Sequence, residues 1–209
     1  MRALCAGLLG AVLGASAATA ADPLVYVPMD PTIAPAQHNW AGWYAGGYFG
    51  GLVGGEFTHD GAGNPGLSGV DAGVQLHYNA IVGNNWILSP FVAATVPVQH
   101  GQLFGVDVKV DWAAQAGIRL GYAHDRWLPY GFLGGMVGQA TTTNLGPETK
   151  THVGFTAGTG VEYAVDDRWA VGARYAYYSL GPQDYFGPGG TQVGWSGHSV
   201  VGTISFKLH

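Results

Sequence analysis

Residues 151–180 alternate bulky and small side chains at every second position. In the first half the odd positions hold valine, phenylalanine and tyrosine among small residues, whereas the even positions are glycine, threonine and alanine with one acidic residue, Glu162. After a polar turn at 166–168 the alternation resumes, with Arg174 as the single charge on the smaller face. Period-two alternation across a tight turn predicts a β-hairpin. A bulky apolar face opposite a small, sparsely charged face is typical of transmembrane barrel strands in lipid.

The composition agrees with a membrane protein that crosses the bilayer with strands. Charged residues make up 10% of the 209 residues, against about 25% in ordinary soluble domains. After the N-terminal segment, no window approaches the hydrophobicity of a spanning helix. A closed barrel is then the arrangement that satisfies every backbone hydrogen bond within lipid. The formal net charge of -5 argues against a nucleic-acid partner.

Residues 1–20 are predicted to be a secretory signal peptide. Arg2 precedes an apolar run at 4–18, and the segment closes on the small-residue pattern Ala-Thr-Ala. The apolar run is shorter than the ~20 residues that a membrane helix needs. The single cysteine, Cys5, falls inside this segment, so the mature chain is expected to have neither a disulfide nor a thiol nucleophile.

Residues 21–39 contain four prolines and are predicted to be an extended periplasmic leader without sheet pairing. Residues 40–209 are predicted to form the barrel. Eight runs of strand-like sequence are expected, at about 40–53, 70–80, 86–99, 107–122, 127–140, 151–165, 169–180 and 195–208. Two prolines, Pro90 and Pro97, interrupt the third run and suggest an edge or a bulge there.

The connections between these runs alternate between long and short. Long ones are expected at 54–69, 100–105, 141–150 and 181–194, and short polar turns lie between them. Outer-membrane barrels have short periplasmic turns and longer external loops. The sequence therefore predicts an all-β fold, an eight-stranded antiparallel up-and-down transmembrane β-barrel located in the bacterial outer membrane.

Three segments carry a resemblance to a known family: the Trp-Ala-Gly-Trp-Tyr-Ala-Gly-Gly start at 40–47, the run at 117–131, and the run at 158–169. Together they resemble the opacity-type, OmpA-like family of small outer-membrane β-barrel proteins, which includes porin-like surface proteins. The resemblance implies a monomeric eight-stranded barrel with a porin-like, surface-antigen or envelope-stabilising role and no shared cofactor. Relatives usually end on an aromatic residue recognised by the barrel-assembly machinery, whereas this chain ends Phe206-Lys207-Leu208-His209. Phe206 lies in register but is not terminal.

Several charged residues are expected to point into the lumen. An eight-stranded barrel is about wide enough for its own side chains to fill it. Burial of an unpaired charge is costly, so we expect a plug of paired charges, with Glu162 on the cross-strand diagonal from Arg174. By strand parity, this lumen charge network comprises Asp71, Lys109, Asp111, Arg119, Glu162 and Arg174.

The large aromatic residues are expected to form belts at the two membrane interfaces. A set of rings that stacks on a ligand is the alternative. The expected interfacial residues are Trp43, Trp86, Trp112, Tyr122, Trp127, Tyr163, Trp169, Tyr175 and Trp195.

Three functions fit these features. A non-enzymatic barrel with a structural or surface role is preferred, in contact with outer-membrane lipid, with the assembly machinery during biogenesis, and with surface ligands through its loops. A small porin-like channel is the first alternative and requires the charge plug to open. A lipid-modifying enzyme is the second and requires His198 to face the lumen or line a cleft, although parity places His198 and Ser199 on opposite faces. No catalytic or cofactor site is predicted. No metal site is predicted either, because the histidines lack metal-ligand spacing.

Overall fold

The computed structural model describes residues 38–58, 68–96, 98–103, 106–142, 148–185 and 191–208. Contacts divide the chain into a unit of residues Met1–Ala34 and a unit of residues Pro35–His209, and the described residues belong to the second. The predicted signal peptide, 1–20, and nearly all of the predicted leader, 21–39, lie outside the described residues. Both therefore stay predictions.

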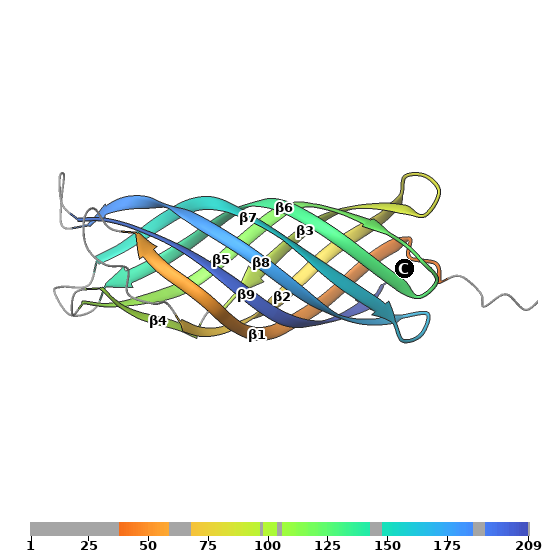
Figure 1. Ribbon diagram of the computed structural model, residues 1–209, viewed down its shortest axis with the longest axis horizontal. Helices are drawn as coiled ribbons and strands as arrows, with labels where there is room; N and C mark the ends of the chain where they lie inside the picture. The colour runs from red at the N-terminus through yellow and green to blue at the C-terminus, as the bar shows by residue number, and fades with distance from the viewer. Residues whose placement is uncertain are drawn as a thin grey trace, which may run out of the picture. The chain divides into compact units, whose positions relative to one another are not determined.

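The described residues form one antiparallel sheet that closes on itself (Figure 1). The first strand pairs with both the second and the last, so no edge is left open along that seam. The strands are β1 (Gly42–Thr58), β2 (Ser68–Ile81), β3 (Trp86–Thr95), β4 (Val98–Leu103), β5 (Val106–Tyr122), β6 (Trp127–Thr142), β7 (Glu148–Ala164), β8 (Trp169–Tyr185) and β9 (Thr191–Lys207). In the same ranges, no helix is long and apolar enough to cross a membrane.

Strands β3 and β4 together fill one position in the barrel. Each pairs with β2 on one side and β5 on the other, and they are separated at Val96 and Pro97. The interruption expected at Pro97 falls between the end of β3 at Thr95 and the start of β4 at Val98, and Pro97 itself lies outside the described residues. Pro90 does not interrupt β3, where it pairs with Ile118 and is exposed on the outer face. The predicted eight-stranded antiparallel barrel is thus confirmed.

The sheet extends further than the sequence indicated. The expected loop 54–69 is strand as far as Thr58 and again from Ser68, and the expected loop 181–194 is strand as far as Tyr185 and from Thr191. Strand also extends into the expected loops 100–105 and 141–150, as far as Leu103 and Thr142 and again from Val106 and Glu148. Gly-rich and polar composition suggested loops, but pairing with a neighbouring strand holds these segments in the sheet; residues 54–58 of β1 and 183–185 of β8, for example, each pair with β9. The remaining segments, including 59–67 and 186–190, lie outside the described residues.

Three short connections lie at one end of the barrel, at 82–85, 123–126 and 165–168. Asn85 (φ 68°) and Asp125 (φ 52°) adopt the left-handed conformation that asparagine and aspartate tolerate in tight turns. We call this the turn end, and the C-terminus lies beside it (Figure 1). The opposite end is the loop end.

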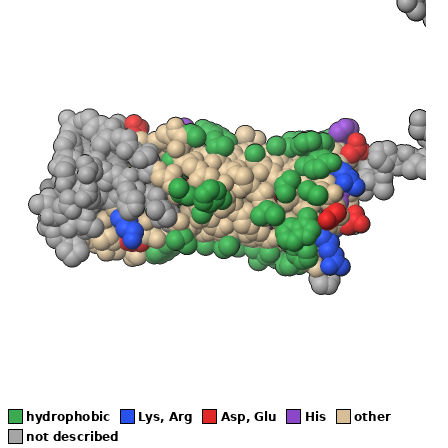
Figure 2. Space-filling model, turned by 90° about the horizontal axis from the view of Figure 1, so that it is seen from below, with side chains coloured by type: hydrophobic (Ala, Val, Ile, Leu, Met, Phe, Trp, Pro, Cys, Tyr) green, Lys and Arg blue, Asp and Glu red, His purple; other side chains and the backbone are tan. Residues whose placement is uncertain are grey.

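Side chains alternate between the outer face and the interior. Along β3 the exposed and buried positions alternate without exception. Large apolar side chains such as Val92, Ile118 and Leu133 are exposed on the outer face. Figure 2 shows charged side chains near the two ends of the barrel, with hydrophobic and uncharged groups between them. The outer surface is therefore an apolar band bounded by polar ends, as a barrel in lipid requires.

Candidate functional site: the closed lumen

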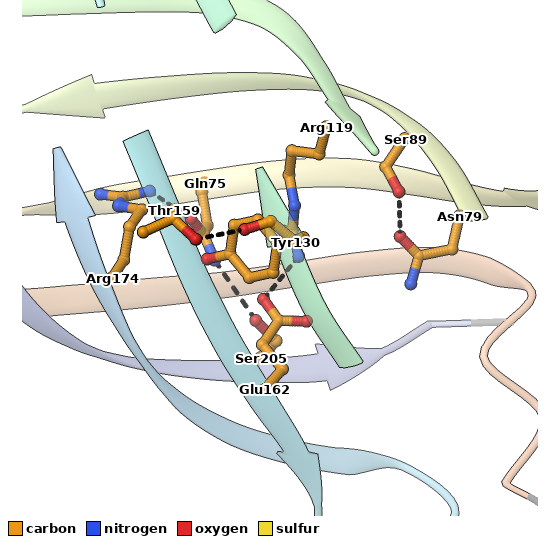
Figure 3. A network of polar contacts seen from close by, with 9 residues as sticks. All are labelled: Gln75, Asn79, Ser89, Arg119, Tyr130, Thr159, Glu162, Arg174 and Ser205. Atoms are coloured by element: carbon orange, nitrogen blue, oxygen red, sulfur yellow. Dashed lines mark hydrogen bonds and ion pairs between the residues drawn. The ribbon is translucent and has the colours of Figure 1, made fainter. Parts of the chain in front are cut away.

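An ion pair joins β5 and β7 across the lumen, on the side of the turn end. Arg119 Nη2 lies 2.8 Å from Glu162 Oε1, and the two side chains are 6% and 1% exposed. The Arg119 guanidinium also lies over the Tyr130 ring, with its Cζ 3.9 Å from the ring centroid. Figure 3 shows these three side chains converging inside the barrel. A hydrogen-bonded pair in a water-poor interior offsets part of the desolvation cost of both charges.

A second polar layer is centred on Arg174. Its Nη1 donates to Gln75 Oε1 at 3.0 Å, and Gln75 Nε2 donates to the Ser205 hydroxyl at 3.3 Å (Figure 3). The guanidinium lies 4.3 Å from the centroid of the Tyr48 ring. Asp71 is buried nearby and forms a hydrogen bond with Ser199. These contacts tie β1, β2, β8 and β9 together across the interior.

The expected charge network is therefore divided. Glu162 pairs with Arg119 and not with Arg174, which corrects the expected diagonal pair. The register places Gly160 opposite Arg174, as expected, but the Arg174 side chain extends toward β2 instead. Lys109 is exposed near the loop end, and half-buried Asp111 accepts a hydrogen bond from the Thr141 hydroxyl at 2.6 Å. Neither joins the two buried layers.

An apolar layer closes the turn end of the lumen. Trp40, 1% exposed, packs there in one buried cluster with Tyr44, Ile87, Leu128, Ala164 and Ala170. The residue before it is tied to the last strand, because Lys207 Nζ donates to the Asn39 carbonyl at 2.6 Å. The His38 ring meets the Trp40 ring edge to face, and partial burial together with Lys207 lowers the pKa of His38. Trp40, the first residue of the predicted barrel, thus plugs the turn end, a role that sequence reasoning missed.

A second apolar layer closes the loop end. It comprises Val110, Ala140, Tyr178, Leu180 and Trp195. Trp195 was expected at the membrane interface, but it is 1% exposed and lies inside the barrel. Its parity on β9 is that of the buried Ser199, Val201 and Thr203, and aromatic character alone suggested the outer position. The indole fills the space above Gly138 and contacts the His152 ring at a centroid distance of 4.5 Å.

Along the lumen, aromatic rings fill the space left by glycines on neighbouring strands. Four inward rings each lie directly opposite a glycine, and a Cβ on that glycine would collide with the ring. The pairs are Tyr48 with Gly73, Tyr130 with Gly160, Phe132 with Gly158, and Tyr178 with Gly197. Sequence reasoning missed these rings. The signal was present as an inward aromatic opposite an inward glycine, but it requires the strand register.

Little free volume remains in the interior. A cavity of about 30 Å³ lies among Asp71, Gln115, Arg174 and Ser199. That is room for about one or two water molecules. Polar and apolar layers therefore alternate along the axis and leave no open path through the described part of the barrel.

Four aromatic pairs surround the turn end on the outer face, each formed across a pair of adjacent strands. They are Trp43 with Tyr78, Trp86 with Tyr122, Trp127 with Tyr163, and Trp169 with Phe206, at centroid distances of 5.1, 5.4, 4.7 and 4.8 Å. Trp112 and Tyr175 are also exposed but lie further toward the loop end. The placement of these rings is that of a belt on the outer surface.

Comparison with known proteins agrees with this architecture. Residues 7–198 match the family model described as "Outer membrane protein beta-barrel domain". The chain is 32% identical over 206 residues to the 31 kDa outer-membrane immunogenic protein of Brucella melitensis, covering 83% of this chain and 85% of that protein. It is 30% identical to the 22 kDa outer membrane protein of Rhizobium leguminosarum bv. viciae over the whole of both chains. The crystal structure of Neisserial surface protein A is similar in fold, with a TM-score of 0.56 at 16% identity, covering 80% of this chain and 98% of that one.

Proposed function

Because the chain belongs to the outer membrane protein beta-barrel domain family, we propose that it is a non-enzymatic structural and surface protein of the bacterial outer membrane. Its barrel would anchor it in lipid and hold the connections of the loop end at the cell surface. The observation that carries this proposal is the filled lumen, closed by Trp40 at one end and Trp195 at the other. The Brucella relative is named as immunogenic, which supports surface exposure of the loop end.

In this proposal the turn end faces the periplasm and the loop end faces outward, as in other barrels of this kind. The charged side chains of Arg126, Asp166 and Arg168 then lie at the periplasmic rim. The barrel-assembly machinery would act on the chain during biogenesis. Surface ligands, if bound, would meet the segments around 59–67 and 186–190, which lie outside the described residues.

A porin-like channel is favoured less by this interior. Conduction would require the Trp40 layer, the Arg119–Glu162 pair and the Trp195 layer to open together. Each layer is packed from several strands, so opening would break side-chain contacts across the whole barrel.

The lipid-modifying alternative required His198 to face the lumen or line a cleft. His198 lies on the outer face of β9, whereas Ser199 is 1% exposed inside the barrel. The hydroxyl and the imidazole therefore cannot act as a nucleophile and its base, which must lie within hydrogen-bond reach.

Single-cysteine labelling tests the proposed orientation. With Cys5 inside the predicted signal peptide, the mature chain offers no competing thiol. Asp184→Cys places a thiol on an exposed position at the loop end, and Asp167→Cys places one at the turn end. A membrane-impermeant maleimide should label Asp184→Cys in intact cells, and Asp167→Cys only after the outer membrane is permeabilised. The reverse pattern would overturn the proposed orientation.

A further inference from the structure

Two aromatic side chains and a histidine form a polar patch on the outer face of β8 and β9. Tyr175 Oη lies 2.6 Å from His198 Nδ1, and the two rings are stacked at a centroid distance of 5.9 Å. Tyr177 packs against the same imidazole at 5.0 Å. Within the described part of the chain the imidazole makes no second hydrogen bond. We call these three residues the β8–β9 patch.

The patch lies within the apolar band, near its outer edge. Phe206 and Trp169 mark the aromatic belt of the turn end on the same two strands. His198 is about eight residues along β9 from Phe206, or ~19 Å for a strand tilted by ~45° with a rise of ~3.3 Å per residue. The apolar band of such barrels is ~25 Å tall. Exposed Val200 and Ile204 lie between His198 and that belt.

A polar group at this depth needs a hydrogen-bonding partner. Burying one in hydrocarbon without a partner costs free energy, and ionisable residues within a membrane therefore mark functional sites. Tyr175 satisfies one imidazole nitrogen. When the tyrosine hydroxyl donates to Nδ1, Nε2 carries the proton and is a donor. In the proposed orientation, the polar groups nearest to this depth outside the barrel are the headgroups of the outer-leaflet lipids.

We propose that the β8–β9 patch binds the phosphorylated sugar headgroup of an outer-leaflet glycolipid. His198 Nε2 donates to a phosphate oxygen, a charge-assisted hydrogen bond. The rings of Tyr175 and Tyr177, with Phe155 at 5.9 Å from Tyr177, present flat apolar surfaces to the headgroup and its first acyl carbons. The inference rests on the proposed orientation, because the loop end must face outward for the patch to lie in the outer leaflet.

The test measures how much lipid stays with the purified barrel. The mature chain is folded into nanodiscs that contain phosphatidylethanolamine and isotope-labelled lipopolysaccharide, extracted in mild detergent, and assayed for bound label. His198→Phe keeps a ring and removes the donor, and should lower retained lipopolysaccharide by about tenfold, the effect of losing one hydrogen bond to a charged group. Tyr175→Phe, which loses only the hydroxyl, should lower it less. The control is His124→Phe, because His124 is exposed at the turn end.

Three results would overturn the proposal. Equal retention by wild type and His198→Phe would show that the patch does not hold the headgroup. Equal retention of phosphatidylethanolamine and lipopolysaccharide would show that the patch does not select the glycolipid. A wild-type dimer that His198→Phe converts to a monomer would make the patch an interface between two copies. A wrong orientation would show separately, in the labelling of Asp184→Cys, which uses none of these residues.

Discussion

Glu162 on β7 reaches past β6 to Arg119 on β5, where Oε1 and Nη2 are 2.8 Å apart. The two strands do not pair with each other, so the ion pair links elements that backbone hydrogen bonds leave unconnected. It lies between the Trp40 layer and the Arg174 layer, and the Tyr130 ring covers its guanidinium. The pair therefore fills part of the lumen and links β5 to β7 across it.

Removing one partner of this pair should destabilise the barrel more than removing both. Arg119→Met leaves Glu162 as an uncompensated buried charge, for which we expect a loss of about 3–5 kcal/mol in the free energy of unfolding. Arg119→Met combined with Glu162→Leu should recover most of that loss, because apolar groups of similar volume pack without a desolvation cost. Urea unfolding in lipid vesicles, followed by tryptophan fluorescence, measures both. A double variant as unstable as the single one would contradict this account.

The glycines opposite the inward rings should not tolerate a methyl group. In Gly158→Ala the added Cβ would collide with the backbone carbonyl of Tyr175 on β8 and would lie 2.6 Å from Phe132 Cε1. Overpacking of this kind costs about 1–3 kcal/mol. The matched control is Gly135→Ala, because a Cβ at Gly135 has no neighbour within 4 Å. Equal stability of the two variants in urea would show that the rings do not depend on these glycines.

The outer face should reject charge at the middle of the bilayer. Leu133 is 58% exposed and lies midway along β6 between Trp127 and Gln139, whose side chain accepts a hydrogen bond from Trp112. Leu133→Arg should lower the free energy of unfolding by about 2–4 kcal/mol in vesicles. Val165→Arg, at the turn after β7, should cost about 1 kcal/mol or less. Similar small losses at both positions would contradict the placement of the band.

The turn after β7 should lose stability in acid. The backbone amides of Arg168 and Trp169 donate to Asp166 Oδ1 at 2.7 and 2.8 Å, and these hydrogen bonds lower the pKa of Asp166 below its ordinary value. A lowered pKa means that the folded state favours the carboxylate. The stabilisation is therefore present above the unfolded-state pKa, about 4, and is lost as the pH falls through the folded-state value. Asp166→Asn should thus unfold at lower urea than wild type at pH 7, and the difference should shrink at pH 3. The control is Asp167→Asn, one residue further on, which leaves both backbone hydrogen bonds to Asp166 in place.

The alternation of side chains was enough to predict the fold, because a period of two assigns each residue to a face wherever the strand is regular. An interruption was expected at Pro97, and β3 ends at Thr95 whereas β4 begins at Val98. The predicted strand ends were wrong at the loop end, since composition favours a loop at 54–69 and 181–194 whereas pairing with β9 continues β1 and β8 there.

The lumen was harder to predict than the fold. Parity places Glu162, Arg119 and Arg174 inside, but which charges meet depends on the stagger between strands that are not neighbours. The predicted interfacial position of Trp195 was wrong, because residue type was given more weight than strand parity. Trp40 has the parity of the buried Tyr44 and Tyr48 in the strand expected at 40–53, but parity alone did not indicate that its ring closes the turn end.

The central claim is that the folded barrel is closed, and single-channel recording of the refolded mature chain in a planar bilayer tests it most directly. Folding is first verified by circular dichroism and by the gel shift of the heat-stable form, and a known porin serves as the positive control. The Trp40 layer, the Arg119–Glu162 pair and the Trp195 layer predict a wild-type trace without steady unitary conductance. Regular conductance steps in the wild type that change when Glu162→Ala and Arg174→Ala are combined would contradict the account and assign the lumen to a pore.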